Sequence, residues 1–313
     1  MILQRLRLWC RLGLLLGLAL VVCPALACQV CVVSSEKAPA FQEAYDSLSL
    51  ELQRLGLARQ DIALLSIAEY QDGGPAVLEA RLLITLGMDA LRHVATRNGK
   101  LLIAGLIPRI SFERVLAESG RKNVASTAAL YLDQPFGRQL DLMRLALPRL
   151  HRVGVLWGPE SVSLQPLLNT AMQARGMELS EGLYGEGQTL IGALQMALHD
   201  ADGLLAVADT AIYNANTVSN ILLTSYRAKV AVQAFSPAYV KAGALLSVHS
   251  TASQIGVQLA AMAYQALQNN NMPQSQYPLD FSVTTNDYIA RSLGLALDAK
   301  ALSDRLHRME KRP

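Results

Sequence analysis

The sequence predicts an α/β protein in which short, buried strands alternate with helices. Three apolar runs in one stretch of the chain carry this prediction: residues 204–208, 230–235 and 244–248, each about one strand long. A helical pattern separates each run from the next, and such alternation is typical of a parallel sheet. The same alternation of strands and helices occurs in both halves of the chain, so we expect two lobes, each built around its own sheet.

Composition and charge limit the class of protein. The chain has 313 residues, of which 51% are hydrophobic and 17% charged, which suits one large domain or two of ordinary size and excludes a disordered chain. The formal charge is +3, but residues 1–27 hold three arginines and no acid, so the remainder carries 25 basic and 25 acidic side chains. A neutral remainder argues against nucleic acid as a partner.

The N-terminus has the pattern of a secretory signal peptide. Three arginines, Arg5, Arg7 and Arg11, precede an apolar segment over residues 12–22. The segment is followed by Ala25-Leu26-Ala27, which matches a small-residue cleavage site. The apolar segment is too short to span a bilayer. We therefore expect residues 1–27 to be removed and the remaining chain to be a periplasmic protein.

Two cysteines, Cys28 and Cys31, follow this leader in C-x-x-C spacing. They could be a redox pair, half of a metal site, or a lipid-modified Cys28; the alternative is that Cys31 is simply buried in the first strand. On one strand, residues three apart have Cα atoms about 10 Å apart, beyond the roughly 7 Å limit for a disulfide. No second cysteine pair completes a metal site. Leu26-Ala27-Cys28 partly matches a lipidation motif, but Ala25 stands where leucine is usual, so we favour an unanchored protein.

The first half of the chain contains five predicted strands with helices between them. A stripe of apolar residues at helical spacing, Phe41 to Leu55, predicts the first helix, and Gly56 ends it. Gly73-Gly74-Pro75 breaks the chain before another helix, and a short helix is expected over residues 89–96. The five strands are expected over residues 29–33, 62–67, 82–86, 101–106 and 128–132.

The pattern restarts after Asp133-Gln134-Pro135, which we take as the hinge between the lobes. Later elements include a helix capped by Thr251 that returns to the first lobe, a strand over residues 281–284 that crosses back, and two C-terminal helices. Further helices are expected at 136–147 and 189–199, and further strands at 153–157 and 177–184. The predicted lobes are 28–133 plus 250–279 and 134–249 plus 280–313.

Polar and aromatic residues follow most of the predicted strands. Ligands of parallel α/β sheets bind outside the carboxyl ends of the strands, so these positions are the candidate ligand contacts. They are Ser34, Ser35, Thr85, Gly87, Asp133, Trp157, Asp209, Thr210, Tyr213, Ser236, Tyr239 and Ser250.

Structural roles compete with binding at several of these positions. Ser34 or Ser35 could cap the first helix, and Asp209 could cap a later one. Trp157 could pack under its loop as readily as stack on a ligand. Arg109 and His249 also follow strands, and whether they contact ligand stays open.

Recognised catalytic and cofactor motifs are absent from the sequence. It has no G-x-S-x-G elbow, no H-E-x-x-H and no Walker A loop, and no G-x-G-x-x-G follows the first strand. The polar strand ends offer hydroxyls and a few carboxylates, which bind ligands but do not form an acid–base pair. We therefore expect a binding protein without enzymatic activity and without a cofactor or metal.

Three segments resemble the uncharacterised ABC-transporter substrate-binding family of type I periplasmic binding proteins: YLDQPFGRQLDLMRLALPRLHRVGVLWGP, ILLTSYRAKVAVQAFSPAYVKAGALLSVHSTASQIG and FSVTTNDYIARSLGL. Their order and spacing carry the resemblance. Many relatives have a proline before the strand that contains Ala231 and Val232, and this chain does not. The resemblance implies the type I fold, with two Rossmann-like lobes and a ligand cleft between them.

The same resemblance implies a function and partners. Such a protein captures a small polar solute and delivers it to the membrane permease of an ABC transporter, as a monomer. Characterised relatives bind aromatic amino acids; here Asp209 would pair with the ligand ammonium, Ser35 and backbone amides would hold its carboxylate, and Tyr213, Phe235 and Tyr239 would fit its ring. The alternative is a periplasmic sensor or adaptor of the same fold that acts on a signalling receptor or another envelope protein.

Overall fold

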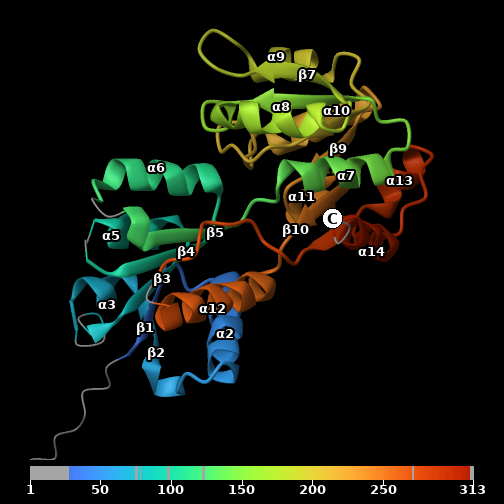
Figure 1. Ribbon diagram of the computed structural model, residues 1–313. Coiled ribbons are helices and arrows are strands. Elements are labelled where there is room, and N and C mark those ends of the chain that lie inside the picture. The colour runs from blue at the N-terminus through green and yellow to red at the C-terminus, as the bar shows by residue number, and fades with distance from the viewer. Residues whose placement is uncertain are drawn as a thin grey trace, which may run out of the picture.

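Two β-sheets, formed one after the other along the chain, organise this protein (Figure 1). The computed structural model describes residues 28–74, 77, 79–96, 99–121, 124–269 and 271–310. The first sheet has the strand order β2-β1-β3-β4-β5 and the second β11-β10-β9-β8-β6-β7. We call the two bodies lobe 1 and lobe 2. The predicted α/β class with Rossmann-like lobes is confirmed, whereas the predicted signal peptide lies outside the described residues.

Lobe 1 is a parallel sheet with helices on both faces. Val30 in β1 lies opposite Ile62 in β2 and Leu82 in β3, and every strand pair in this sheet is parallel. The strands are β1 (Val30–Ser34), β2 (Ile62–Ser66), β3 (Leu82–Leu86), β4 (Leu101–Ile107) and β5 (Thr127–Tyr131). The helices are α2 (Pro39–Arg54), α3 (Ile67–Gln71), α5 (Met88–Ala95), α6 (Arg109–Ser119) and α12 (Ala252–Asn269), with 3₁₀ turns η1 (Arg59–Asp61) and η2 (Val124–Ser126).

The alternation of side chains along β1 divides the core of lobe 1 into two clusters. Val30 and Val32 pack toward α2 and α12, while Cys31 and Val33 pack toward α3, α5 and α6. Successive residues of a strand point to opposite faces of the sheet. An uninterrupted apolar strand such as this one is therefore expected in a sheet covered on both faces.

Gly256 allows α12 to pack closely against α2. A Cβ atom at this position would lie 2.2 Å from the carbonyl oxygen of Ala44. Replacing Gly256 by alanine gains about 1 kcal/mol of helix propensity, but the overlap forces the helices apart, and overpacking costs typically 1–3 kcal/mol. We expect a net loss of up to about 2 kcal/mol in the free energy of unfolding, measured by urea denaturation.

The matched control for this change is Gly185→Ala, because a Cβ at Gly185 meets nothing within 4 Å. We expect the control to change the free energy of unfolding by less than about 0.5 kcal/mol. Equal effects at the two glycines would contradict the close helix contact.

Lobe 2 is a six-stranded sheet, parallel except at one edge. Its last strand, β11, runs antiparallel to β10, with Leu246 opposite Thr285. The strands are β6 (Arg152–Trp157), β7 (Glu178–Leu183), β8 (Gly203–Leu205), β9 (Ala231–Ala234), β10 (Leu246–His249) and β11 (Ser282–Thr285). The helices are α7 (Phe136–Ala146), α8 (Gln165–Gln173), α9 (Leu190–Leu198), α10 (Val218–Arg227), α11 (Pro237–Ala242), α13 (Asp287–Ser292) and α14 (Ala299–Glu310), with the 3₁₀ turn η3 (Val162–Leu164).

Three segments of the chain connect the lobes. The first follows β5, the second joins β10 to α12, and the third returns from α12 to β11 (Figure 1). On its way back, the third segment pairs with β5, where Gln276 forms an isolated bridge with Leu130. We propose the lobe boundaries 28–133 plus 250–279 and 134–249 plus 280–313, since α12 packs on α2 and β11 pairs with β10.

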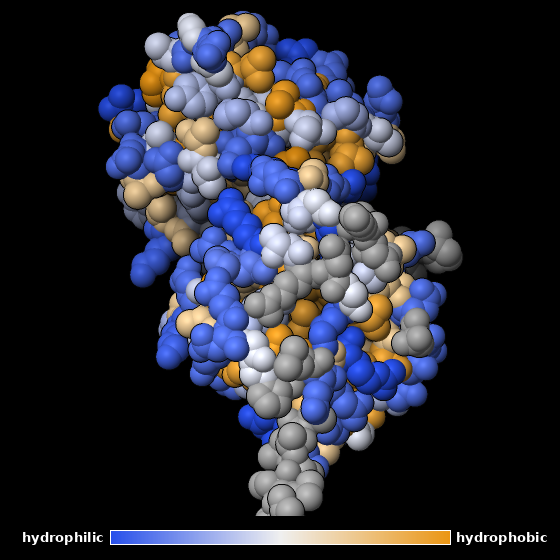
Figure 2. All heavy atoms as spheres, turned by 90° about the vertical axis from the view of Figure 1, so that its left-hand side faces the viewer, coloured by the Kyte–Doolittle hydropathy of each residue, from blue (hydrophilic) through white to orange (hydrophobic). Residues whose placement is uncertain are grey.

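The space-filling view shows two rounded lobes that meet at a narrower waist (Figure 2). Hydrophilic residues cover much of this face, with single hydrophobic residues scattered between them. Within the part of the chain that the structure describes, no helix is long and apolar enough to cross a membrane.

Candidate functional site

A pocket with a volume of about 280 Å³ lies between the lobes. Residues that follow the strands on both sides form its wall: Pro108 after β4, Leu132 after β5, Ala206 after β8, Phe235 after β9 and Ser250 after β10. The carboxyl ends of both parallel sheets therefore face the same cavity, which is where α/β proteins of this topology bind ligands.

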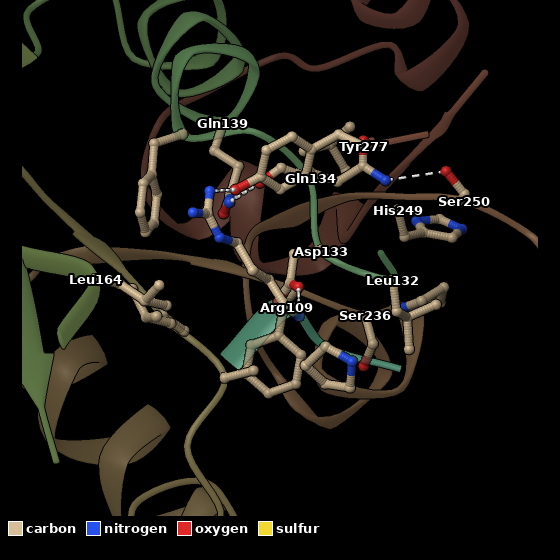
Figure 3. Close-up of a pocket in the computed structure, with 18 residues that line it drawn as sticks. Arg109, Leu132, Asp133, Gln134, Gln139, Leu164, Ser236, His249, Ser250 and Tyr277 are labelled. Atoms are coloured by element: carbon tan, nitrogen blue, oxygen red, sulfur yellow. Dashed lines mark hydrogen bonds between the residues drawn. The ribbon is translucent and has the colours of Figure 1, made fainter. Parts of the chain in front are cut away.

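Three of the twelve candidate residues line this interlobe pocket: Asp133, Ser236 and Ser250. Arg109 and His249, which the sequence left open, line it as well (Figure 3). These five residues come from four separate segments, and the fold brings them together. Gln134, Gln139 and Tyr277 add further polar groups to a wall that is otherwise largely apolar.

Asp133 is the carboxylate of the pocket. Its Oδ2 accepts a hydrogen bond from the backbone N–H of Arg109, the first residue of α6. Burial raises the pKa of the Asp133 carboxyl above its ordinary value, and the Arg109 N–H opposes that shift. Burial penalises the ionised form of the Asp133 carboxyl. A cationic group of a ligand beside Asp133 would offset this penalty, and the carboxylate would in turn stabilise the cation.

Arg109 places a guanidinium at the same wall. Its Nη1 donates to the Tyr277 hydroxyl at 3.2 Å and its Nε donates to Glu113 at 2.7 Å. The hydrogen bond with Tyr277, and then that with Glu113, raise the pKa of Arg109 further above its already high ordinary value, against the opposing effect of burial. The guanidinium is thus a fixed positive charge at the pocket wall, held beside the Tyr277 hydroxyl (Figure 3).

Ser250 and Gln134 join the segments that connect the lobes. The Gln134 Nε2 donates to Ser250 Oγ at 2.9 Å, and Ser250 Oγ donates to the carbonyl of Asp280 at 2.7 Å. Arg138 donates to Gln134 Oε1 at 2.6 Å and to the carbonyl of Pro278 at 2.8 Å. One hydrogen-bond network therefore holds all three connections, and the hydroxyl of Ser250 is used within it.

Four candidates from lobe 1 lie away from the interlobe pocket. Ser34 and Ser35 border a second hollow of about 510 Å³ at the ends of β1 and β2. Ser35 Oγ accepts from the backbone N–H of Ala90 in α5, so Ser35 ties β1 to α5 rather than capping the first helix. Thr85 is fully buried, which corrects the expectation that it contacts ligand.

Gly87 has a steric role in the same region. It adopts φ of 88°, and a Cβ there would lie 2.7 Å from both Ser35 Oγ and the Phe41 ring. Only glycine fits such a position readily. The close approach at Gly87 is therefore to protein atoms.

Trp157 packs in the core of lobe 2, which is the structural one of the two roles that the sequence left open, and it does not line the interlobe pocket. Its side chain belongs to the core of lobe 2, where only 1% of the residue is exposed. The indole N–H donates to Glu181 Oε1 at 2.7 Å. A buried indole with a satisfied donor contributes to packing rather than to a cleft surface.

Asp209 organises two loops instead of facing a solute. Its Oδ2 accepts from the backbone N–H groups of Glu160 and Ser161 and from the Ser161 hydroxyl, at 2.8 to 3.0 Å, and its Oδ1 accepts from Ala211 N–H at 3.0 Å. The residue is 3% exposed and does not line the pocket. The expected pairing of Asp209 with a ligand ammonium is thus replaced by a structural role, because protein donors already occupy both oxygens.

Three further candidates, Thr210, Tyr213 and Tyr239, also serve the structure of lobe 2. The Thr210 hydroxyl and N–H donate to Glu160 Oε2 at 2.9 and 3.0 Å. Tyr213 is buried with its ring edge-on to Phe235 and Tyr239, and the Tyr239 hydroxyl donates to the carbonyl of Tyr213 at 3.0 Å. Of this aromatic cluster, Phe235 reaches the pocket wall and the two tyrosines support it from behind.

An ion pair connects the lobes beside the pocket. Arg114 in α6 of lobe 1 donates to Glu160 Oε1 of lobe 2 at 3.1 Å. Both side chains are partly exposed, so the pair contributes at most about 1 kcal/mol to the stability of this arrangement. Hydrogen bonds from Thr210 and the ion pair with Arg114 outweigh the effect of burial and lower the pKa of Glu160, which is thus charged when it meets Arg114.

Several residues that line the interlobe pocket were not among the candidates predicted from the sequence. Phe136 and Leu164 come from lobe 2 and Tyr277 from the third connection, and all three line the pocket. Apolar wall residues look like core residues in a sequence. Tyr277 lies in a polar loop whose path back along β5 only the folded chain reveals. Among the described residues, no group of three or more His, Cys, Asp or Glu is placed to hold a metal ion.

His249 gives the pocket a pH-dependent group. Burial lowers the pKa of His249 below its ordinary value, so the unfolded chain binds this proton more tightly than the folded one. The stabilising contribution is complete above the unfolded pKa of about 6.5 and is lost as the pH falls from there toward the lower folded pKa, with a slope of at most about 1.4 kcal/mol per pH unit. We expect His249→Gln to flatten this part of the stability profile, measured by urea denaturation between pH 7 and pH 5 (roughly the range in which histidine titrates).

The matched substitution for this experiment is His93→Gln, at an exposed histidine of α5. We expect the His93 variant to keep the slope of the native protein. A native slope in the His249 variant, or an equal flattening in both, would contradict the burial effect.

Comparisons with known proteins agree with this architecture. The family model described as ABC transporter substrate binding protein matches residues 123–302. No curated protein sequence matches the chain.

Solved structures with the same fold cover nearly the whole chain at low identity. The ligand-free, open structure of a substrate binding protein with adhesive properties from Clostridium difficile is 13% identical, with a TM-score of 0.67 over 86% of this chain and 96% of that one. A conserved domain protein from Vibrio cholerae is 18% identical, with a TM-score of 0.59 over 89% and 98%. A domain in complex with L-Trp from Streptococcus pneumonia is 14% identical, with a TM-score of 0.56 over 88% and 97%.

The structural likeness establishes the fold, in which two sheets face a common pocket. The family model spans more than half of the chain, from the last strand of lobe 1 to the C-terminal helix of lobe 2. This chain belongs to the family of ABC transporter substrate binding proteins, with the type I periplasmic-binding fold.

Proposed function

We propose that this protein is an exported solute-binding protein that captures a small polar molecule, an amino acid or a related compound, and delivers it to the permease of an ABC transporter. The observation that carries the proposal is the interlobe pocket, where the Asp133 carboxylate and the Arg109 guanidinium stand among apolar side chains. A pocket of about 280 Å³ has room for a molecule of amino-acid size.

The chemistry of the wall suits a zwitterion with an apolar side chain. Asp133 would bind the ammonium group, and Arg109 with Ser236 would bind the carboxylate. Phe136, Phe235 and Leu164 would contact the side chain of the ligand. The hydroxyl of Ser250 is bound to Gln134 and to the carbonyl of Asp280 rather than to a base, so the proposal is binding without turnover.

The two-lobed fold supports a capture mechanism by closure. Wall residues come from both lobes, so a bound solute would contact both and favour the closed arrangement over the open one. The Arg114–Glu160 pair would form and break with the same movement. The leader at residues 1–27 would send the protein to the periplasm, where we propose that it acts as a monomer.

Two relatives of the same fold leave the ligand class open. One is in complex with L-Trp, and a periplasmic ribose ABC transporter protein from Conexibacter woesei has a TM-score of 0.50 to this chain. An amino acid is preferred here because of the opposite charges of Asp133 and Arg109, which a sugar does not need. The experiment below can return either class.

The test begins with the solute that the protein itself selects. The purified protein is denatured, the released small molecules are identified by mass spectrometry, and uptake of the identified compound is measured in cells with and without the gene. We expect the gene deletion to abolish high-affinity uptake and the native gene to restore it. Binding of the compound with unchanged uptake would contradict delivery to a transporter and favour a sensor that acts on a receptor.

A further inference from the structure

Cys28 and Cys31 lie on the same face of the first sheet, although regular strand geometry would separate them. Along an extended strand, residue 28 would share a face with Val30 and Val32. Instead, Cys28 packs in the cluster that contains Cys31 and Val33, on the side of α5 and α6. Cys28 is 2% exposed and Cys31 is fully buried.

A bend at Gln29 produces this arrangement. Strand β1 begins at Val30, and the preceding residue is a bend. The carbonyl of Gln29 accepts hydrogen bonds from the backbone N–H groups of Arg81 and Leu82, both at 3.1 Å, which hold the bend at the start of β3. The side chain of Cys28 is thereby turned to the face of Cys31.

The two thiols are in hydrogen-bond contact. This contact lowers the pKa of Cys28 and raises that of Cys31, and the ammonium of Lys100 lowers the pKa of Cys28 further. Both cysteines are buried and reduced in this structure. The expectation of Cα atoms about 10 Å apart applies to two residues of one strand, whereas Cys28 precedes strand β1.

We propose that Cys28 and Cys31 form an intramolecular disulfide in the exported protein, by exchange with a disulfide-bearing oxidant of that compartment. The inference rests on the export that the proposed function includes. Exported proteins meet an oxidising environment in which paired thiols are converted to disulfides. No third ligand accompanies the pair among the described residues, so a metal does not compete for it.

The exchange proceeds in two balanced steps. In the newly exported chain, before folding buries the pair, the Cys28 thiolate attacks one sulfur of the oxidant's disulfide, which forms a mixed disulfide and releases one thiolate. The Cys31 thiol loses its proton and attacks the Cys28 sulfur, which forms the Cys28–Cys31 bond and releases the second thiolate. Two protein thiols are oxidised, one oxidant disulfide is reduced to two thiols, and the protons pass to the released thiolates.

A disulfide also decides the fate of Cys28. A lipid anchor would need the sulfur of Cys28 as a thioether, and a sulfur bonded in that way cannot also form the bond to Cys31. The disulfide would tie the beginning of the described chain to β1, which lies between β2 and β3 in the sheet. The two modifications therefore exclude each other and can be distinguished by mass.

The test uses the full-length gene with its own leader, expressed in a bacterial host. Cells are fractionated, and the protein is denatured in the presence of N-ethylmaleimide and mapped by peptide mass spectrometry. We expect the peptide with both cysteines to lack maleimide and to be lighter than its reduced form by two hydrogen atoms. After reduction it should take up two maleimides, and the Cys31→Ser variant should take up one without reduction.

Other outcomes separate the disulfide from the proposed function. Protein outside the cytoplasm whose two cysteines both carry maleimide without reduction would overturn the disulfide alone. A lipid adduct on Cys28 would overturn it as well. Protein confined to the cytoplasm would contradict export, and with it the proposed function.

Discussion

Replacing Arg138 by methionine is expected to lower the free energy of unfolding by about 3 kcal/mol or more. The Arg138 side chain is 6% exposed and donates to both oxygens of Glu310 at 2.6 and 2.8 Å. It also donates to Gln134 and Pro278, and its guanidinium lies 4.3 Å from the centre of the Phe281 ring. Removing one partner of a buried ion pair costs about 3–5 kcal/mol, and the lower end applies because Glu310 is about one-third exposed.

Loss of Arg138 should also affect the hinge. Its partners Gln134 and Pro278 belong to two of the three connections between the lobes, and Glu310 brings the C-terminal helix to the same point. With these contacts gone, the third connection is held less firmly, so we expect weaker ligand binding together with lower stability. Urea denaturation and a ligand titration of the same variant measure the two effects.

The control for the Arg138 variant lies on the same helix. Arg144 is an exposed residue of α7 with a single hydrogen bond, to the carbonyl of Arg175. We expect Arg144→Met to change the free energy of unfolding by less than about 1 kcal/mol. A similar small change at Arg138 would show that the network does not stabilise the hinge.

Replacing Asp209 by alanine is expected to cost about 3–5 kcal/mol of unfolding free energy. The carboxylate accepts four hydrogen bonds from three residues, and it joins the loop after β6 to the loop after β8. Without it, the buried N–H groups of Ser161 and Glu160 lose their acceptor, and each unsatisfied donor costs roughly 1–3 kcal/mol. Asp209→Asn keeps one oxygen and should lose less, while Asp72→Ala, at an exposed aspartate, should change little.

The same substitution separates the two roles considered for Asp209. If Asp209 pairs with a ligand ammonium, Asp209→Asn would reduce affinity strongly at nearly native stability. If the role of Asp209 is structural, Asp209→Asn should lower the stability of the protein. Ligand affinity should then fall only to the extent that the adjoining wall residue Ala208 shifts. Melting temperature and ligand affinity, measured on the same protein, decide between them.

Much of the fold follows from local sequence patterns. The strands of lobe 1 were expected within one or two residues, because uninterrupted apolar runs such as Leu101–Ile107 are typical of strands buried on both faces. The run over residues 204–208 gave a shorter strand, since β8 ends at Leu205 and the next residues form the pocket wall. The antiparallel direction of β11 has no local signal, because it depends on the path of the third connection.

The candidate site was only partly predictable. Of the candidates from the strand-end rule, Asp133, Ser236 and Ser250 line the pocket, because the rule locates the edge of the sheet that faces it. It failed at Trp157 and Asp209, because a position at a strand end does not determine which way the side chain points. Polar residues at such ends also satisfy loop N–H groups, and Asp209 does so with both oxygens.

Contacts between residues that are far apart in the chain, or that depend on a local bend, could not be predicted from the sequence. Tyr277 reaches Arg109 from a loop 168 residues further along the chain. The contact of Cys28 with Cys31 depends on a single bend at Gln29, which strand periodicity does not reveal. In each case the decisive contact joins segments whose approach is set by tertiary structure.

The claim that the interlobe pocket binds a solute is tested most directly by filling it. Thermal unfolding is measured for the native protein, for Ser236→Trp in the pocket wall, and for Ser303→Trp on α14 as the control, with the L-amino acids and with ribose. We expect an amino acid at a hundredfold excess over its Kd to stabilise the native and control proteins by about 2.7 kcal/mol, and to leave the melting temperature of Ser236→Trp unchanged. An equal shift in the Ser236 variant, or no shift with any compound, would contradict the claim that the interlobe pocket binds a solute.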